Sequence, residues 1–183
     1  MKPDCEVLFE GEHLSFLRCR GWEYVEHRKA KQSVMVVAVT PEESLVLADE
    51  FRPAIGARMI CLPAGLVGDV EEEDPEAAAR RELREETGYE AASLEFLGRG
   101  PGSAGASSEI VTFFLARNVR LAGEQAAEDR GLIQVHLVPL PDVLDWARQR
   151  EKGEAFIDPK VWAGLYLAAA GGVTAALPRV AKS

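Results

Sequence analysis

An unbroken apolar run at residues 33–40, SVMVVAVT, is the feature that most limits how this chain can fold. Such a run without polar alternation is typical of a central strand that is covered on both faces. Residues 44–48 follow as its expected hairpin partner. Further strands are predicted at 58–62, 93–97, 110–115 and 133–138, with loops at 98–108 and 122–131 and helices from Pro141 to Arg148 and from Pro159 to Ala170. The main core is therefore expected to begin near residue 33.

The residues before this run predict a small antiparallel ribbon. Short apolar and polar stretches at 6–10, 13–17 and 22–27 are separated by Gly11 and Gly21. Two or three isolated strands are at best marginally stable. We therefore expect a ribbon at 1–30 that packs on a main domain at 31–183 or on a second subunit, and 183 residues suit one such core.

Charge and hydropathy limit the classes of partner that this chain is expected to bind. Lys and Arg number 21 against 30 Asp and Glu, a net charge of -9, which argues against a protein that wraps nucleic acid. No apolar run approaches the roughly 20 residues that cross a bilayer, and the first residues lack a signal-peptide pattern. We expect a cytoplasmic protein without membrane contact.

The three cysteines are predicted to be reduced thiols. Cys5, Cys19 and Cys61 are odd in number and show no CxxC spacing. Neither a disulfide framework nor a zinc site is expected from this pattern.

An acidic helix is predicted at residues 75–87. Asp74 suits the N-cap, Pro75 suits the first turn, and Gly88 ends the helix. At about 100° per residue, Glu85 lies about 60° to one side of Glu82 and Glu86 about 40° to the other. Three carboxylates on one narrow face repel each other, and the alternatives are a solvated face or a site for a hard divalent cation such as Mg²⁺ or Mn²⁺.

The segment that begins at Gly65, includes Glu73 and continues through RELREETGY at 81–89 resembles the Nudix box. This box is the signature of hydrolases that cleave a nucleoside diphosphate linked to another group. The resemblance implies an α/β fold, an α/β/α sandwich with a mixed sheet and an N-terminal antiparallel ribbon. One departure is that seven residues separate Gly65 from Glu73, whereas the family usually has five.

The resemblance also implies a metal site. Glu82 and Glu86 match the main ligands, Glu85 assists directly or through water, and the carbonyl of Ala64 matches a backbone ligand. Mg²⁺ is the expected cofactor, with Mn²⁺ as the alternative. Glu73 and Arg81 are expected to pair and brace the loop against the helix.

Most of the chain is similar to the ADP-ribose and nucleoside-diphosphate-sugar pyrophosphatases. The resemblance implies that Trp22 stacks on the nucleobase, that Arg52 reaches the diphosphate, and that the ribbon exchanges within a homodimer. In the loop SAGASSE at 103–109, Ala104 replaces the proline that marks ADP-ribose enzymes, and Glu109 matches a residue that holds or orients a metal. Cys61 stands where the family often has Glu.

The resemblance does not identify the general base. The position of the catalytic glutamate in related enzymes corresponds to about Gly131, so the nearby Glu128 and Asp129 are the candidates. The alternative for both is that they are simply solvated loop residues. The expected reaction is metal-dependent hydrolysis of a nucleoside diphosphate sugar, with ADP-ribose giving AMP and ribose 5-phosphate. The alternatives are another nucleotide sugar, such as GDP-mannose, and a non-hydrolytic nucleotide-sugar sensor.

Overall fold

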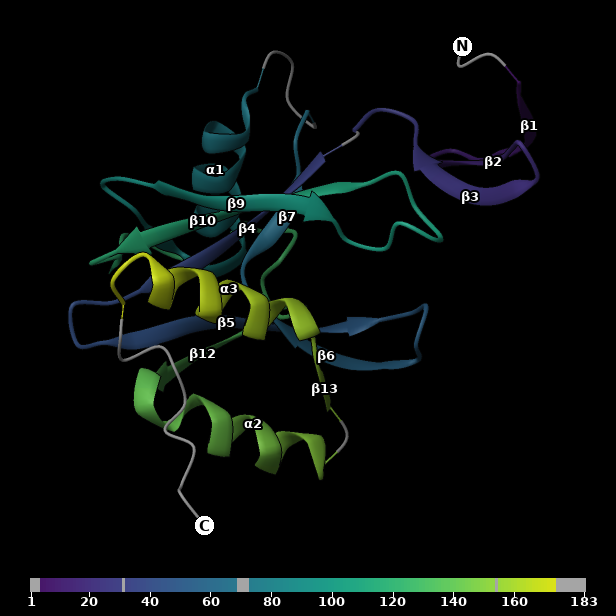
Figure 1. Cartoon of the computed structure of the whole chain (residues 1–183). Coiled ribbons are helices and arrows are strands. Elements are labelled where there is room, and N and C mark those ends of the chain that lie inside the picture. Colours follow the sequence, from purple (N-terminus) through teal and green to yellow (C-terminus); the bar gives the residue numbers. More distant parts are fainter. Residues whose placement is uncertain (1–3, 31, 69–72, 154, 174–183) are drawn as a thin grey trace.

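A mixed β-sheet forms the centre of the molecule (Figure 1). The computed structural model describes residues 4–30, 32–68, 73–153 and 155–173. The strands of this sheet are β4 (Gln32–Val39), β5 (Ser44–Arg52), β6 (Ala57–Cys61), β7 (Ala64–Leu66), β9 (Glu95–Pro101), β10 (Ile110–Arg117), β12 (Gln134–Pro139) and β13 (Ala155–Ile157). The main order is β13-β6-β5-β4-β10-β9, with β12 paired to β5 and β7 to β4. The β4–β10 and β6–β13 pairs are parallel, and the others are antiparallel.

Strand β4 is buried on both faces, as the apolar run predicted. Helix α1 (Pro75–Thr87) covers one face, and α2 (Val143–Glu151) and α3 (Pro159–Ala170) cover the other (Figure 1). A short helix, η1 (Leu140–Asp142), leads into α2. Side chains at even positions of β4, such as Val36, pack with Leu83 of α1, whereas odd positions, such as Val37, pack with Leu165 of α3. The expected α/β/α sandwich with a mixed sheet is confirmed.

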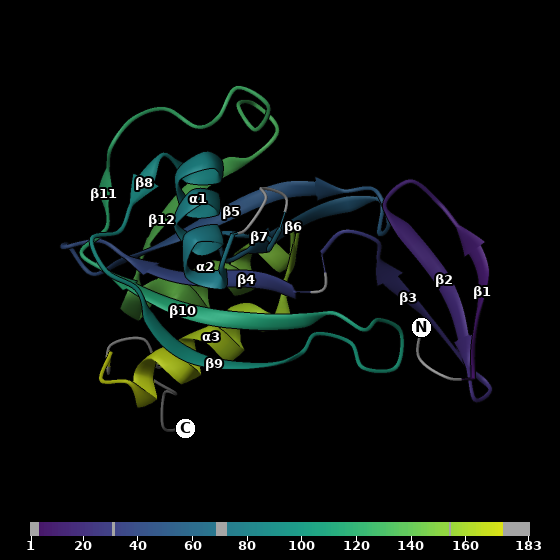
Figure 2. The ribbon, with the colours of Figure 1, turned by 90° about the horizontal axis from the view of Figure 1, so that it is seen from above.

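The N-terminal ribbon is a separate three-stranded antiparallel sheet. It consists of β1 (Cys5–Glu10), β2 (Leu14–Cys19) and β3 (Trp22–His27). Figure 2 shows it beside the main sheet, next to the loop that joins β9 and β10. Val25 is held to this loop by two backbone hydrogen bonds, from its N to Ala106 O at 2.9 Å and from Ser108 N to its O at 3.2 Å. The ribbon therefore shares a boundary with the 102–109 loop.

The prediction of three reduced thiols is wrong for two of them. Cys5 and Cys19 form a disulfide, and Cys61 is free and buried. The two half-cystines lie directly opposite each other on β1 and β2. Counting cysteines and looking for CxxC cannot detect this pair, because the pairing register of the ribbon brings the sulfurs together.

Two predicted connections also differ from the structure. Strand β5 pairs with β4 only where Val39 meets Leu45, because β7 takes the rest of that edge through pairs such as Met35 with Ala64. Strand β9 continues to Pro101, so the predicted 98–108 loop is shorter. The structure adds a small sheet of β8 (Tyr89–Glu90) and β11 (Arg120–Leu121). None of the described helices is long and apolar enough to cross a membrane.

Candidate active site

Helix α1 begins and ends where the sequence predicts. The side chain of Asp74 accepts a hydrogen bond from Ala77 N at 2.8 Å, and Pro75 occupies the first turn. Gly88 caps the other end with a left-handed φ of 77°, a conformation that glycine adopts without strain. With both ends fixed and Leu83 packed on the sheet, the carboxylate face is held beside β7.

Arg81 links the carboxylates of this face. Its Nη1 donates to Glu82 Oε1 and to Glu85 Oε2, each at 2.8 Å. The same guanidinium donates to both carboxylate oxygens of Glu73, at 2.9 and 3.0 Å, so the predicted brace is confirmed. The hydrogen bond with Glu73 is the largest cause of the raised pKa of Arg81. Glu85 and Glu82 raise this pKa further, whereas partial burial of the guanidinium lowers it. The arginine therefore offsets the mutual repulsion of the acids.

The close contact between β7 and α1 depends on Gly65. A Cβ atom at this position would lie 1.9 Å from the carboxyl carbon of Glu82, so any side chain here would force that carboxylate to move. The neighbouring Ala64 N donates to Glu86 Oε2 at 3.0 Å. Two glutamates of α1 are thus positioned by consecutive residues of β7.

Glu82 and Glu86 are buried, and Glu85 is half-buried. Burial raises the pKa of Glu86 well above its ordinary value, the hydrogen bond from Ala64 opposes that shift, and the charges of Glu82, Glu50 and Asp129 add to it. Burial among other acids therefore favours the neutral form of this carboxyl group, and a cation would stabilise its ionised form.

The end of β5 contributes two further charged groups. Arg52 forms an ion pair with Glu50, and Cys61 Sγ lies 3.9 Å from Glu50 Oε1. The Nε of Arg52 is buried and has no hydrogen-bond partner among the described residues. Burial, with the charges of Glu86 and Glu50, raises the pKa of the Cys61 thiol. Glu50 was not predicted as a site residue, although two-residue strand periodicity puts it on the same face as Arg52.

The loop at 122–131 is attached to the last turn of α1. Gln125 Nε2 donates to Glu86 O, and Ala126 N donates to Glu85 O at 2.8 Å. Asp129 is half-buried on this loop, and its pKa is raised by burial, then by Glu128 and Glu85. Glu128 is exposed. Of the two candidate bases, Asp129 is thus the one whose pKa is raised by a glutamate of the acidic face, Glu85.

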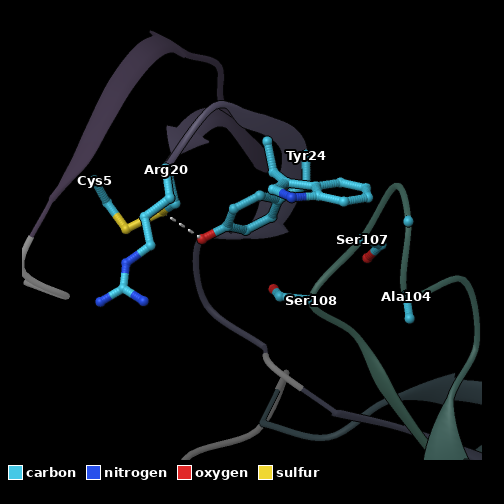
Figure 3. Close-up of a pocket in the computed structure, with 9 residues that line it drawn as sticks. Cys5, Arg20, Tyr24, Ala104, Ser107 and Ser108 are labelled. Atoms are coloured by element: carbon cyan, nitrogen blue, oxygen red, sulfur yellow. Dashed lines mark hydrogen bonds between the residues drawn. A yellow bond between two sulfur atoms is a disulfide. The ribbon is translucent and has the colours of Figure 1, made fainter.

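A second region brings Trp22 and Ala104 together. They line a pocket of about 430 Å³ between the ribbon and the 102–109 loop (Figure 3). The other lining residues are Cys5, Cys19, Arg20, Tyr24, Gly105, Ser107 and Ser108. Trp22 is 70% exposed as a residue, so its side chain is accessible to a ligand.

Glu109 lies at the base of the 102–109 loop. Its backbone N donates to Ser107 Oγ at 3.1 Å, and its O accepts a hydrogen bond from Gly102 N at 3.4 Å. A Cβ at Gly102 would lie 3.4 Å from Glu109 Oε2. These contacts place the carboxylate beside the loop that borders the Trp22 pocket.

The donor set fits a hard divalent cation. Carboxylate oxygens suit Mg²⁺-like ions, which often bind through one or two carboxylates plus substrate phosphates. Within the part of the chain that the structure describes, no three acidic, histidine or cysteine side chains form a ready-made metal cage. Glu82 and Glu85 are held by Arg81 instead. The arrangement fits a cation that is shared with a phosphate-bearing ligand.

The α/β/α sandwich places an acidic helix face against Gly65 of β7, and these carboxylates suit a divalent cation. Residues 29–158 match the family model described as the NUDIX domain. The chain therefore belongs to the Nudix family, and it is a Nudix pyrophosphohydrolase that uses divalent metal ions.

Individual relatives agree with this assignment. The chain is 36% identical over 134 residues to the ADP-ribose pyrophosphatase of Bacillus subtilis, covering 73% of this chain and 70% of that protein. It is 34% identical over 139 residues to the methanol dehydrogenase activator of Bacillus methanolicus, covering 75% and 70%. A solved structure described as an ADP compounds hydrolase superposes with a TM-score of 0.67 and 19% identity, covering 92% and 91%, and shows the same fold.

Proposed function

We propose that this enzyme hydrolyses the diphosphate bond of a nucleoside diphosphate sugar, with ADP-ribose converted to AMP and ribose 5-phosphate. The observation that carries the proposal is the acidic face of α1, where Glu82 and Glu86 are buried against Ala64 and Gly65 of β7. The name of the Bacillus subtilis relative supports ADP-ribose as the substrate. The replacement of the marker proline by Ala104 keeps GDP-mannose and other nucleotide sugars as candidates for the same test.

The residues that would hold the metal are Glu82, Glu85, Glu86 and the carbonyl of Ala64. Mg²⁺ is the proposed ion, and Mn²⁺ has the same preference for oxygen ligands. When bound, the ion neutralises charge on the diphosphate and lowers the pKa of the attacking water. The protein's contribution is the positioning of these oxygens by Gly65 and by the hydrogen bond from Ala64 N.

Arg52 is the proposed diphosphate ligand. Its buried Nε has no hydrogen-bond partner among the described residues, and an unpaired buried donor is costly. A guanidinium group matches phosphate oxygens in geometry and charge. The Arg52 side chain is 43% exposed, so its accessible guanidinium nitrogens can contact a diphosphate oxygen while the ion pair with Glu50 holds the side chain in place.

Asp129 is the proposed general base. The loop that carries it is tied to the last turn of α1 through Gln125 and Ala126, so its carboxylate is held near the acidic face. In this role Asp129 Oδ takes the proton of the attacking water. The Asp129→Asn variant should lose at least about a hundredfold in kcat, whereas Glu128→Gln, which changes an exposed neighbour, should stay within about threefold.

The Trp22 pocket is the proposed nucleobase site. An exposed indole face offers stacking area, and Ser107 and Ser108 line the opposite side of the pocket (Figure 3).

The ribbon at 1–30 is further proposed to exchange between two subunits of a homodimer. Exposed apolar side chains on the ribbon, including Val7 and Phe9, support a role in association.

The test is a turnover panel with Mg²⁺ on the wild type and two variants. ADP-ribose, GDP-mannose, UDP-glucose, ADP-glucose and nucleoside triphosphates would be assayed by product chromatography. Glu86→Gln should lose on the order of 10²–10³ in kcat. Glu76→Gln, an exposed glutamate on the first turn of the same helix, is the matched control.

The outcomes separate the alternatives. Full activity of a folded Glu86→Gln protein would remove the proposed centre. Silence across the panel, with ADP-ribose still raising the melting temperature, would favour the nucleotide-sugar sensor.

A further inference from the structure

The pocket beside the ribbon is cationic at one end. Arg20 lines it together with Tyr24, Ser107 and Ser108. In Figure 3 the Arg20 guanidinium lies on the side of the Tyr24 hydroxyl, away from Ser107 and Ser108. A ligand that spans the pocket would therefore meet hydroxyl groups at one end, an aromatic wall in the middle and a guanidinium at the other end.

Arg20 differs from Arg18 and Arg28 of the ribbon in having no acidic partner among the described residues. Arg18 pairs with Glu23 at 2.7 Å, and Arg28 pairs with Glu10 at 2.7 Å. No ion pair or side-chain hydrogen bond of Arg20 occurs among the residues that the structure describes. The Arg20 guanidinium at the edge of the pocket is therefore available to pair with an anionic group of a ligand.

The backbone of Arg20 adds an independent observation. Arg20 and Gly21 form the two-residue turn between β2 and β3, with φ angles of 49° and 84°. Such hairpin turns favour Asn, Asp or Gly, because other residues are strained in the left-handed region. The turn thus fixes the backbone of Arg20 at the edge of the pocket.

We propose that Arg20 is a specificity-determining residue that favours substrates whose nucleoside half carries an additional phosphate. This inference rests on the proposed function, in which Trp22 stacks on the base. A phosphate on the ribose of the stacked nucleoside adds a dianion within the reach of a flexible arginine side chain. The substrate class is thus a 2′- or 3′-phosphorylated ADP-ribose rather than ADP-ribose alone.

The test compares kcat/KM for 2′-phospho-ADP-ribose, 3′-phospho-ADP-ribose and ADP-ribose. The wild type should prefer one phosphorylated compound about tenfold at low salt, and the preference should shrink as salt screens the contact. Arg20→Asn should remove the preference through a higher KM for that compound, since Asn suits the left-handed turn and keeps the hairpin.

Arg28→Asn is the matched control, because it removes one positive charge from the ribbon outside the pocket and should keep the wild-type ratio. An equal ratio in the wild type and Arg20→Asn, or a wild-type preference for ADP-ribose, would overturn the inference. Calorimetric binding of the same compounds without added metal gives the ratio independently of turnover. Absent hydrolysis with an Arg20-dependent binding ratio would therefore refute the proposed function and uphold this inference.

Discussion

Reduction of the Cys5–Cys19 disulfide should destabilise the ribbon while leaving the main domain intact. The bond joins residues 14 positions apart. A crosslink that closes a loop of this length restricts the unfolded chain by about 3 kcal/mol. Each strand of the ribbon has one large exposed aromatic residue, namely Phe9, Phe16 and Trp22. The ribbon therefore has little buried core to compensate for the loss of the crosslink. The ribbon is therefore expected to open locally about a hundredfold more often once reduced.

Hydrogen exchange read by mass spectrometry measures this opening. Peptides from 5–27 should exchange about a hundred times faster in the presence of a phosphine reductant, and the Cys5→Ser/Cys19→Ser protein should match the reduced wild type. Peptides from β4 and α3, which share the main core, serve as the internal control. Unchanged protection of the ribbon, or an equal loss in β4 and α3, would show that the disulfide does not act locally.

Three other perturbations test the packing around the site. Gly65→Ala should displace Glu82 and reduce kcat at least about tenfold, since the new Cβ would meet the carboxylate; activity assays with circular dichroism check this. Gly88→Ala should cost about 1–3 kcal/mol in urea unfolding, because its φ is positive and the Cβ would lie 2.3 Å from Gly123 O. Cys61 should resist iodoacetamide at pH 8 until the protein unfolds, because burial raises the pKa of its thiol and keeps the reactive thiolate scarce. Rapid labelling of native protein would contradict that reasoning.

Local signals in the sequence predicted much of the site. The capping residues of α1 fixed its ends, and helical periodicity placed Glu82, Glu85 and Glu86 on one face. The pairing of Glu73 with Arg81 was expected from the family resemblance, and the structure shows it as a bidentate ion pair. These features depend on residues close together in the chain, so the sequence carries them directly.

Features that depend on distant pairing were missed or incomplete. The Cys5–Cys19 bond needs the register of two strands, and the displacement of β5 from β4 needs knowledge that β7 inserts along the same edge. Glu50 gains significance only because β5 and β6 bring it near Cys61. No propensity or motif at these positions reports on such contacts.

The parallel pairing of β4 with β10 has a consequence for how the chain assembles. Gln32 is paired with Ile110 and Val39 with Arg117, and the whole of α1 lies between them in the sequence. During synthesis, α1 can therefore form through local contacts long before the sheet on which it packs is complete. Closing such a long loop is slow, and a nascent chain that ends before residue 117 leaves one edge of β4 without its neighbour. The docking of β10 is thus the step expected to limit folding.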